Sequence, residues 1–405
     1  MKDFAKLFFE RYTSDFSQLP VEKLKSLLRV KAQTILPSLD DVFSKPERVK
    51  LGIDPTAADI HIGHLCPLMV LNIFAKAGHH VDFVIGDFTS KIGDPSGRVA
   101  ERAMLTDAQI AENYKTYTVQ AGRYVDMNKF TVRKNGEWLG KMTLADFLGV
   151  QGHINAATVM QRDDFRKRLE TTGVTMRELA YSTLQGLDSV ALNSTIELGG
   201  VDQLLNLQSG REIQRIHNQP AQVIITTPLL LGIDGRKMSK TYNNYIALSA
   251  TSEDKFGKIM AIADDLIMQY YKSFTYVFED ELPELGDFIK TNPMEAKKQL
   301  GTYFVAIEAK NIQAGQTERA KFEKKFSKRE LTEGDFTVVS VKQGTTLLDA
   351  LIAGGKFKSK AELKRLLQSG AVRNLDDNSV IAVDVVITNT MKVKVGKLNF
   401  FEIIC

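Results

Sequence analysis

Cysteine and long apolar runs are the two features that this chain most conspicuously lacks. Its 405 residues include two cysteines, Cys66 and Cys405, and one tryptophan. With one cysteine in an expected helix and the other at the last position, the chain offers neither a disulfide framework nor a thiolate metal site. No apolar run reaches the roughly 20 residues of a membrane-spanning helix. We therefore expect no membrane partner and no tightly bound metal.

The N-terminal run Met1-Lys2-Asp3-Phe4 carries an acid and no apolar core, so no signal peptide is expected. Together with the scarce cysteines, this favours a cytoplasmic protein in a reducing compartment. The formal net charge of +4 permits nucleic-acid binding without arguing for it. The length allows two or three domains of roughly 100–200 residues each.

A change of pattern near residue 46 indicates the fold class. Residues 1–45 are predicted to be an N-terminal helical segment. From 46 to 249, short β-rich runs alternate with amphipathic helices, which predicts an α/β, Rossmann-like doubly wound parallel sheet as the catalytic domain. A helical insertion at about 106–170 contains Trp138. The strand-like runs are 49–53, 81–85, 195–198 and 223–227.

The β pattern fades after residue 250 and returns in a small C-terminal unit. Residues 250–326 are predicted to form an α-helical domain, whose longest helix starts after Asn292 because Pro293 suits a first helical position. A polar linker follows at 327–336. Residues 337–405 predict a small α+β domain, with helices at 345–353 and 360–369 and strands at 371–373, 385–387 and 391–401.

Two histidines follow the first strand, in the run His61-Ile62-Gly63-His64. They are three residues apart and share a face where a loop enters a helix, whose N-terminus adds positive potential for phosphate. Gly63 leaves room for a nucleotide to approach. A surface coincidence or a zinc pair is the alternative, although the Glu that metalloproteases place between such histidines is missing.

A basic cluster far downstream complements the histidines. The run Arg236-Lys237-Met238-Ser239-Lys240-Thr241 follows a glycine-containing turn at 232–235 that suits a mobile loop. Flexible lysines on such a loop can close on the β- and γ-phosphates of ATP and hold the leaving pyrophosphate. A solvated basic loop is the alternative, but the apolar Met238 inside the run does not fit it well.

In this order, the two clusters resemble the HIGH and KMSKS signatures of class I aminoacyl-tRNA synthetases. The segments between them resemble the tyrosyl-tRNA synthetase family, especially the bacterial subgroup with a KLG-DPTA-DIHIGH run. The resemblance covers nearly all of 48–312 and the C-terminal unit. The matching segments are 50–57, 59–61, 92–98, 181–189 and 197–203.

The resemblance implies ATP-dependent activation of L-tyrosine to tyrosyl-adenylate and transfer of tyrosine to the 3′ end of tRNA(Tyr). It implies ATP as a substrate that carries Mg²⁺, and a homodimer to whose interface the 106–170 insertion contributes. A buried carboxylate facing a phenol rejects phenylalanine, because the carboxylate would be left unpaired; tyrosyl-tRNA synthetase is itself the standard example of this discrimination.

Site residues carry over from the family motifs position by position. On the tyrosine side, Asp188 is assigned to the phenol, and the remaining residues to the ammonium, the carboxylate or the pocket wall: Tyr181, Gln185, Asp94, Gln203 and Gly52. The nucleotide side comprises ribose and phosphate contacts: Gly200, Asp202, Asp54, Thr56, Gly63 and Met238. The catalytic set is His61, His64, Lys237, Lys240 and Thr241. Plainer interpretations stay open, with Asp202 as a helix cap, Asp188 as a solvated helical residue and Tyr181 as a core aromatic.

Three positions depart from the family pattern. Lys50 stands where many members place a second tyrosine against the substrate phenol. Thr241 replaces the final serine of the second signature and keeps a hydroxyl. The dipeptide Tyr242-Asn243 replaces the more usual Leu-Gly and puts the mobility of the loop in question.

The C-terminal unit resembles the small RNA-binding module named after ribosomal small-subunit protein four. Its basic residues would contact phosphates and shape, without reading bases directly. They are Lys358, Lys360, Lys364 and Arg365. An amphipathic helix with ordinary solvated lysines is the alternative.

Three rival functions stay open from the sequence. A tryptophanyl enzyme shares both signatures, but Tyr181, Gln185 and Asp188 favour tyrosine. A simple nucleotidyltransferase would lack the lysine loop and the RNA-binding module. A catalytically idle paralogue that binds RNA would have no need to keep His61 and Lys237.

Overall fold

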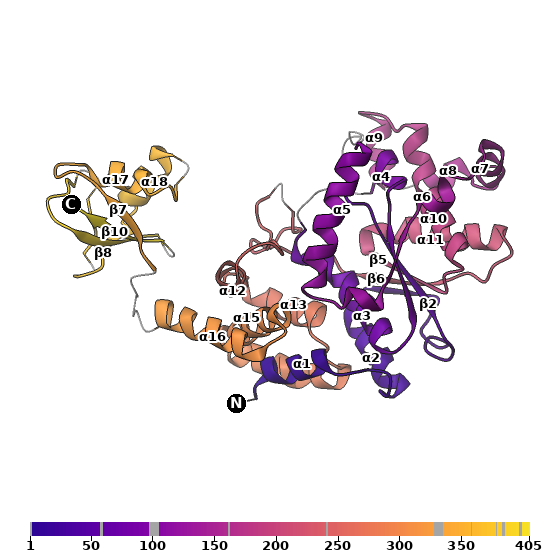
Figure 1. The fold of residues 1–405 in the computed structure, drawn as a ribbon, viewed down its shortest axis with the longest axis horizontal. Helices are drawn as coiled ribbons and strands as arrows, with labels where there is room; N and C mark the ends of the chain where they lie inside the picture. The colour runs from indigo at the N-terminus through magenta and orange to yellow at the C-terminus, as the bar shows by residue number, and fades with distance from the viewer. Residues whose placement is uncertain are drawn as a thin grey trace. The chain divides into compact units, whose positions relative to one another are not determined.

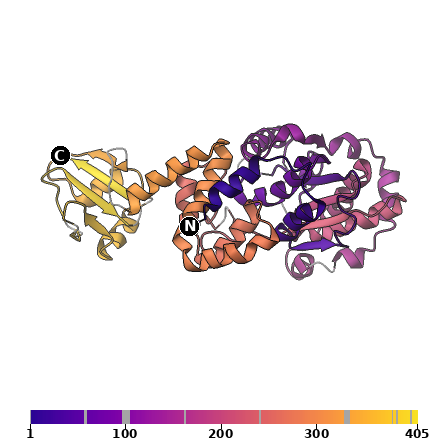
Figure 2. The same ribbon diagram turned by 90° about the horizontal axis from the view of Figure 1, so that it is seen from below.

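The computed structural model describes residues 2–56, 60–96, 105–160, 163–239, 242–327, 335–357, 359–377, 379–382, 385–396 and 399–405. The chain forms two compact units, Met1–Arg319 and Ala320–Cys405, with the boundary inside helix α16 (Ile312–Phe322). Figures 1 and 2 show helices around a sheet in the first unit and a small sheet with short helices in the second. All of 1–249 and most of the predicted helical domain thus pack as one unit. Along the described ranges, no helix has the length and apolar character to cross a bilayer.

A six-stranded sheet organises the first unit. The strand order is β1-β6-β5-β2-β3-β4, and every pair is parallel except β1 with β6. The chain moves outward from β2 to β3 and β4 on one side, and continues with β5 and β6 on the other. This arrangement confirms the α/β, Rossmann-like prediction and creates a crevice at the carboxyl ends of β2 and β5. The strands are β1 (Thr34–Leu36), β2 (Arg48–Ile53), β3 (His80–Ile85), β4 (Thr131–Lys134), β5 (Ile196–Gly200) and β6 (Val223–Thr227).

Helices pack on both faces of this sheet because side chains alternate along each strand. Val49 and Leu51 of β2 enter the main apolar core, which helix α3 (Leu65–Lys76) shares. Lys50 between them points to the opposite face and contacts helix α10 (Met176–Leu192). Helix α11 (Leu204–Ile216) packs against α10 and against β5 and β6.

The segment between β3 and β5 adds one strand and several helices to the sheet. Strand β4 lies within the insertion predicted as mostly helical, and it pairs with β3 at the sheet edge. A small apolar cluster joins the insertion to α10 and α11 through Leu139, Val150, Leu187 and Ile213. The helices are α4 (Thr89–Ile92), α5 (Asp107–Gly122), α6 (Gly136–Leu139), α7 (Leu144–Gln151), α8 (Ala156–Met160) and α9 (Asp163–Leu169).

The predicted helical N-terminal segment is only partly helical. Thr34–Leu36 forms β1, which pairs antiparallel with Ile224–Thr226 at the sheet edge. The prediction of an all-helical segment was wrong there, because three residues before Pro37 are too few to show a strand period. The helices of this segment are α1 (Phe4–Thr13) and α2 (Val21–Lys31).

Helices α1 and α2 pack against a second group of helices that follows the sheet. In this group Pro293 is the first residue of α15, as expected for a residue that has no backbone N–H to satisfy. Helix α15 contacts α1, α12, α13 and α14. The group consists of α12 (Ser252–Met260), α13 (Ile267–Phe274), α14 (Leu282–Thr291), α15 (Pro293–Ala309) and α16.

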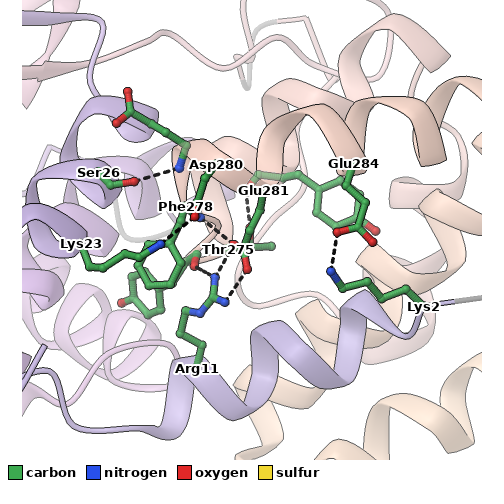
Figure 3. Close-up of polar contacts among 12 residues, drawn as sticks. Lys2, Arg11, Lys23, Ser26, Thr275, Phe278, Asp280, Glu281 and Glu284 are labelled. Carbon is green, nitrogen blue, oxygen red and sulfur yellow. Dashed lines mark hydrogen bonds and ion pairs between the residues drawn. The ribbon is translucent and has the colours of Figure 1, made fainter. Parts of the chain in front are cut away.

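Ion pairs join the N-terminal helices to the segment before α14 (Figure 3). The guanidinium of Arg11 donates to both carboxylate oxygens of Glu281, at 2.6 and 2.7 Å. Its Cζ lies 4.0 Å from the ring centroid of Phe278. Lys23 of α2 pairs with Asp280 beside it, and Lys2, just before α1, pairs with Glu284 inside α14.

The second unit is a four-stranded sheet, order β7-β10-β9-β8, that packs with two helices. The run 391–401, predicted as one strand, is a hairpin: β9 ends at Val395, and Gly396 takes a φ of 66° that breaks the strand. The expected strand at 385–387 is only an isolated bridge between Val386 and Thr346. The elements are β7 (Thr337–Ser340), α17 (Leu347–Ala353), α18 (Lys360–Gln368), β8 (Val372–Asn374), β9 (Met391–Val395) and β10 (Asn399–Ile404).

Short helices complete the described chain. They are the 3₁₀ helices η1 (Ile62–His64), η2 (Met127–Lys129), η3 (Val201–Gln203), η4 (Asp264–Leu266) and η5 (Glu279–Glu281), and the π-helical turn η6 (Glu323–Ser327). Of these, η3 directly follows the end of β5, and η1 is the next described element after β2. Both adjoin the cavity described next.

Candidate active site

One cavity, of about 900 Å³, lies at the carboxyl ends of β2, β3, β5 and β6. Ligands in open parallel sheets bind in this position. Every predicted site residue of the first unit that the structure describes lines it: Gly52, Asp54, Thr56, His61, Gly63, His64, Asp94, Tyr181, Gln185, Asp188, Gly200, Asp202, Gln203, Lys237 and Met238. The predicted Lys240 and Thr241 lie outside the described residues.

The two histidines are held by the short helix η1 that leads into α3. The backbone N–H of Gly63 donates to Nδ1 of His61 at 3.2 Å, and the N–H of His61 donates to Nδ1 of His64 at 3.3 Å. The two ring centroids are 4.2 Å apart. A Cβ on Gly63 would lie 3.0 Å from the His61 ring, so a larger residue would displace that ring. The imidazoles thus adjoin the cavity at the start of a helix.

The basic loop reaches the same cavity. Nζ of Lys237 lies 3.3 Å from Oδ2 of Asp202, which follows β5. Met238 is buried, and its N–H donates to the carbonyl of Leu230 at 2.9 Å. Asn244 fastens the loop, since its Oδ1 accepts from the N–H of Ser239 at 2.8 Å. Residues 237–239 of the loop therefore form a hydrogen-bonded part of the cavity wall.

One departure from the family pattern has a structural explanation. Asn243 takes a φ of 52° in the left-handed region, where the usual residue is glycine. Asparagine is among the few side chains that adopt this conformation readily. Tyr242 lines the cavity, and the guanidinium of Arg236 lies 4.5 Å from its ring centroid. The Tyr-Asn dipeptide thus keeps the turn that glycine would allow.

A half-buried carboxyl, that of Asp54, lies just past the end of β2. Oδ2 of Asp54 accepts from the Tyr181 hydroxyl at 3.0 Å, and Oδ1 accepts from Thr89 at 2.7 Å. Burial raises the pKa of Asp54 to about 7, and the nearby Asp94 and Asp188 add to the rise. Burial also holds the pKa of Tyr181 far above its ordinary value, so its hydroxyl stays protonated. The Tyr181 hydroxyl therefore donates to Asp54, and its own oxygen can still accept a hydrogen bond from a ligand.

The cavity has a second carboxylate, that of Asp188 on α10, and this one is buried. Nε1 of Trp138 donates to its Oδ1 at 2.9 Å, and Nδ2 of Asn135 lies 3.4 Å from its Oδ2. Burial raises the pKa of Asp188 to about 6, while the charge of Lys50 and these donors oppose the rise. The carboxylate is thus an acceptor held in an apolar wall, and a solvated helical residue is excluded.

Sequence reasoning missed Asn135, Trp138 and Thr89 as partners of the two carboxyls. Asn135 Nδ2 also donates to Thr89 Oγ1 at 2.9 Å, which links Asp54 to Asp188 through three hydrogen bonds. The available signal was position, because Asn135 directly follows β4 at the carboxyl edge of the sheet. That signal depends on recognising β4, which the sequence did not reveal.

Amide and carboxylate side chains form the wall beside β5. Nε2 of Gln203 donates to Oδ2 of Asp94 at 2.7 Å, and Asn206 donates to Oε1 of Gln203 at 2.9 Å. Nε2 of Gln185 donates to the buried Glu197 at 3.1 Å. A Cβ on Gly200 would lie 2.6 Å from Oδ1 of Asp202, so a larger residue here would displace that carboxylate. Asp94, Gln203 and Gln185 therefore face the cavity in fixed orientations.

The predicted RNA-binding residues belong to the second unit. Lys360 begins α18 and pairs with Asp349 at 2.5 Å. Lys364 and Arg365 are exposed on the same helix, whose buried side chains are Leu363 and Leu367. Lys358 lies outside the described residues.

Among the described residues, no three His, Cys, Asp or Glu side chains cluster in a way that could hold a metal ion. The histidine pair is therefore not part of such a cluster within those ranges, and the zinc interpretation gains no support there. The cavity instead gathers imidazoles, a lysine and backbone at helix starts, which are groups that suit phosphate.

Comparisons with known proteins identify the family. The model for "tRNA synthetases class I (W and Y)" matches residues 44–331. A tyrosine–tRNA ligase of Thermotoga maritima is 38% identical over 394 residues, which cover 95% of this chain and 98% of the relative. One of Geobacter metallireducens is 40% identical over 337 residues, 81% of this chain and 83% of the relative.

Solved structures share the fold. A C-terminally truncated mitochondrial tyrosyl-tRNA synthetase of Aspergillus nidulans aligns with a TM-score of 0.62 at 21% identity, covering 80% of this chain and 100% of that one. The match of the family model over most of the chain and the full-length relatives agree with the sequence motifs. The chain therefore belongs to the class I tRNA synthetases of the tryptophan and tyrosine group, within the tyrosyl-tRNA synthetase family.

Proposed function

We propose that the cavity activates L-tyrosine with ATP and that the enzyme then passes tyrosine to tRNA(Tyr). The observation that carries this proposal is the buried Asp188, held as an acceptor by Trp138 in the same cavity that His61, His64 and Lys237 line. One cavity thus combines an acceptor suited to a phenol with imidazole and lysine side chains suited to phosphates. The relatives named above are tyrosine–tRNA ligases.

In the first step the tyrosine carboxylate attacks the α-phosphorus of ATP. An O–P bond forms, the bond from the α-phosphorus to the bridging oxygen breaks, and pyrophosphate leaves with that electron pair. The nucleophile is already anionic, so no strong general base is needed. The work is positioning and charge stabilisation, which His61, His64 and Lys237 would supply to the phosphates. Mg²⁺ would arrive on ATP.

Residues of the amino-acid end have separate tasks in this proposal. Asp188 accepts from the phenol hydroxyl. The Tyr181 hydroxyl donates to Asp54 and so presents its oxygen to the substrate ammonium, next to Asp94 and Gln185. Gln203 donates to Asp94 and lies near the substrate carboxylate.

On the nucleotide side, Gly200 and Asp202 would contact the ribose, and Asp54, Thr56 and the histidines the phosphates. Gly63 and Met238 would adjoin the nucleotide, and Lys240 and Thr241 would complete the phosphate loop. In the second step a ribose hydroxyl of the terminal adenosine of the tRNA attacks the adenylate carbonyl. An ester forms and AMP leaves.

The C-terminal unit and the insertion would supply the macromolecular contacts. Exposed Lys364 and Arg365, with Lys358 and Lys360, would contact tRNA phosphates, whose binding weakens as salt rises. For the homodimer, the insertion exposes large apolar side chains, including Leu144 at 73% and Leu148 at 57%. Such exposed apolar residues favour an interface.

Amino-acid-dependent ATP–pyrophosphate exchange, with each of the twenty amino acids and no tRNA, tests the activation step. We expect exchange with tyrosine alone, and we expect Asp188→Asn to lose it while ATP binding persists. Exchange with tryptophan would keep the fold and overturn the role of Asp188. Absence of exchange with any amino acid would favour the idle RNA-binding paralogue.

A further inference from the structure

Lys50 and Glu197 form a buried ion pair one layer behind the cavity wall. They are Cα partners on the adjacent parallel strands β2 and β5, so their side chains project to the same face. Nζ of Lys50 lies 2.9 Å from Oε1 of Glu197, and the two side chains are 0% and 1% exposed. Neither residue lines the cavity. Burying such a pair costs desolvation energy, which good geometry and added hydrogen bonds offset only in part.

Both charges hold the same turn of α10. Nζ of Lys50 donates to the carbonyl of Gln185 at 3.1 Å and to Oγ of Ser189 at 2.7 Å. Oε1 of Glu197 accepts from Nε2 of Gln185, and Oε2 accepts from Oγ of Ser189, both at 3.1 Å. Residues 185, 188 and 189 share one face of a helix. The pair therefore fixes the turn that presents Gln185 and Asp188 to the cavity.

The surrounding packing leaves this arrangement little freedom. The Gln222 amide donates to Oε2 of Glu197 from the other side. A Cβ on Gly210 of α11 would lie 2.7 Å from that amide nitrogen and 3.1 Å from Oε2 of Glu197. A Cβ on Gly186 would lie 3.1 Å from Cα of Gly210. Glycines thus bring α10, α11 and the ion pair into direct contact.

The pair also acts on the charge of Asp188. Burial is the main cause that raises the pKa of Asp188; the positive charge of Lys50 opposes it, and Glu197 adds to it. Asp54 and Tyr181 are the other titratable groups that interact with Asp188. Charged groups on the other elements packed around α10 are engaged elsewhere: Lys91 with Asp107, Arg133 with Glu137, Arg168 with Glu178, and Arg215 with Glu212.

We propose that the Lys50–Glu197 pair is a positioning and specificity element of the amino-acid pocket, which fixes the Gln185–Asp188 turn and places a positive charge behind the phenol acceptor. Lys50 thereby supports the phenol acceptor from behind the cavity wall, at one of the positions where this chain departs from the family pattern. This inference rests on the proposed function, because it assigns the phenol to Asp188.

The test compares Glu197→Gln with the double variant Lys50→Met/Glu197→Gln in tyrosine-dependent ATP–pyrophosphate exchange, from about pH 5 to about pH 9. Lys50→Met alone leaves a buried carboxylate without its cation and risks unfolding. In Glu197→Gln the Lys50 ammonium keeps the Gln185 carbonyl, the Ser189 hydroxyl and the new glutamine carbonyl oxygen as acceptors. Glutamine keeps an acceptor for Gln185 in both variants, and the double variant additionally loses the two hydrogen bonds that Lys50 donates to α10. Circular dichroism and the KM for ATP show whether each variant is folded and binds the nucleotide.

We expect the acid limb of kcat/KM for tyrosine to lie lower in Glu197→Gln than in the wild type. We expect the acid limb of the double variant to lie about one pH unit above that of Glu197→Gln, because the double variant lacks the lysine charge that stabilises ionised Asp188. A limb at the same pH in both folded variants would overturn the inference. If the wild type shows no exchange with tyrosine, the proposed function fails instead.

Discussion

Replacing Trp138 with phenylalanine is predicted to raise the pH at which tyrosine activation begins. The indole N–H is the shorter of two hydrogen bonds to Asp188, 2.9 Å against 3.4 Å from Asn135. Ionised Asp188 is the stronger acceptor for the phenol, because a hydrogen bond to a charged group is roughly twice as strong as a neutral one. Activity is therefore highest above its pKa and falls as the pH falls through it. That pKa is about 6, raised by burial and held down in part by Trp138.

The size of the shift follows from the lost hydrogen bond. A bond to a charged group contributes about 1.5–3 kcal/mol. One pKa unit corresponds to about 1.4 kcal/mol. The acid limb should therefore move up by about one to two pH units in Trp138→Phe. Asp54, whose pKa is about 7, titrates in the same cavity, so the shifted acid limb of Asp188 should merge with the titration of Asp54.

The assay is the pH dependence of kcat/KM for tyrosine in pyrophosphate exchange, which reports the free enzyme. Arg133→Met is the matched control. The Arg133 guanidinium lies 5.7 Å from the Trp138 ring centroid and pairs with Glu137, without contacting Asp188. An unmoved limb in Trp138→Phe, or an equal shift in the control, would refute the assignment.

Three further changes have expected outcomes. Lys237→Ala should slow adenylate formation in single-turnover kinetics with little effect on tyrosine binding, and equal loss of both would contradict its role toward phosphate. Asp54→Asn should raise the melting temperature in calorimetry more at about pH 8 than at about pH 5. Because the pKa of Asp54 is raised in the folded protein, ionisation of this carboxyl destabilises the fold progressively between about pH 4 and pH 7. A gain independent of pH would count against that. Glu281→Gln should lower the free energy of unfolding in denaturant by about 1.5–3 kcal/mol, because Arg11 loses a carboxylate that accepts two hydrogen bonds. An unchanged unfolding midpoint would show that the pair contributes nothing.

The parts of this fold that could be predicted are those with a clear local pattern. The run 223–227 is apolar and β-branched, and it forms β6 with the same bounds. Strand β1 has three residues, too few to show a period, and the turn at Gly396 interrupts an otherwise continuous β-rich run. Local patterns therefore located the long elements and missed the short edge strand and the hairpin.

The candidate site likewise combines residues that are close in the sequence with residues that only the fold brings together. His61, Gly63 and His64 lie within four residues and could be recognised together. Trp138 and Asp188 are 50 positions apart and meet only because β4 joins the sheet edge. Lys50 and Glu197 are paired by strand register, which no local pattern encodes. Sequence reasoning noticed Lys50 as a departure without seeing what it contacts.

The ion pair between Arg11 and Glu281 has a consequence for synthesis on the ribosome. The two residues are 270 positions apart, so at about 5–20 residues per second roughly 15–50 s pass between their appearance. During that interval α1 has no helix α15 to cover Phe4 and Phe8, which are buried in the finished protein. Helix α1 is thus made well before the helices that complete its contacts. Nascent chains that end before α15 should expose this apolar face and bind chaperones that recognise it.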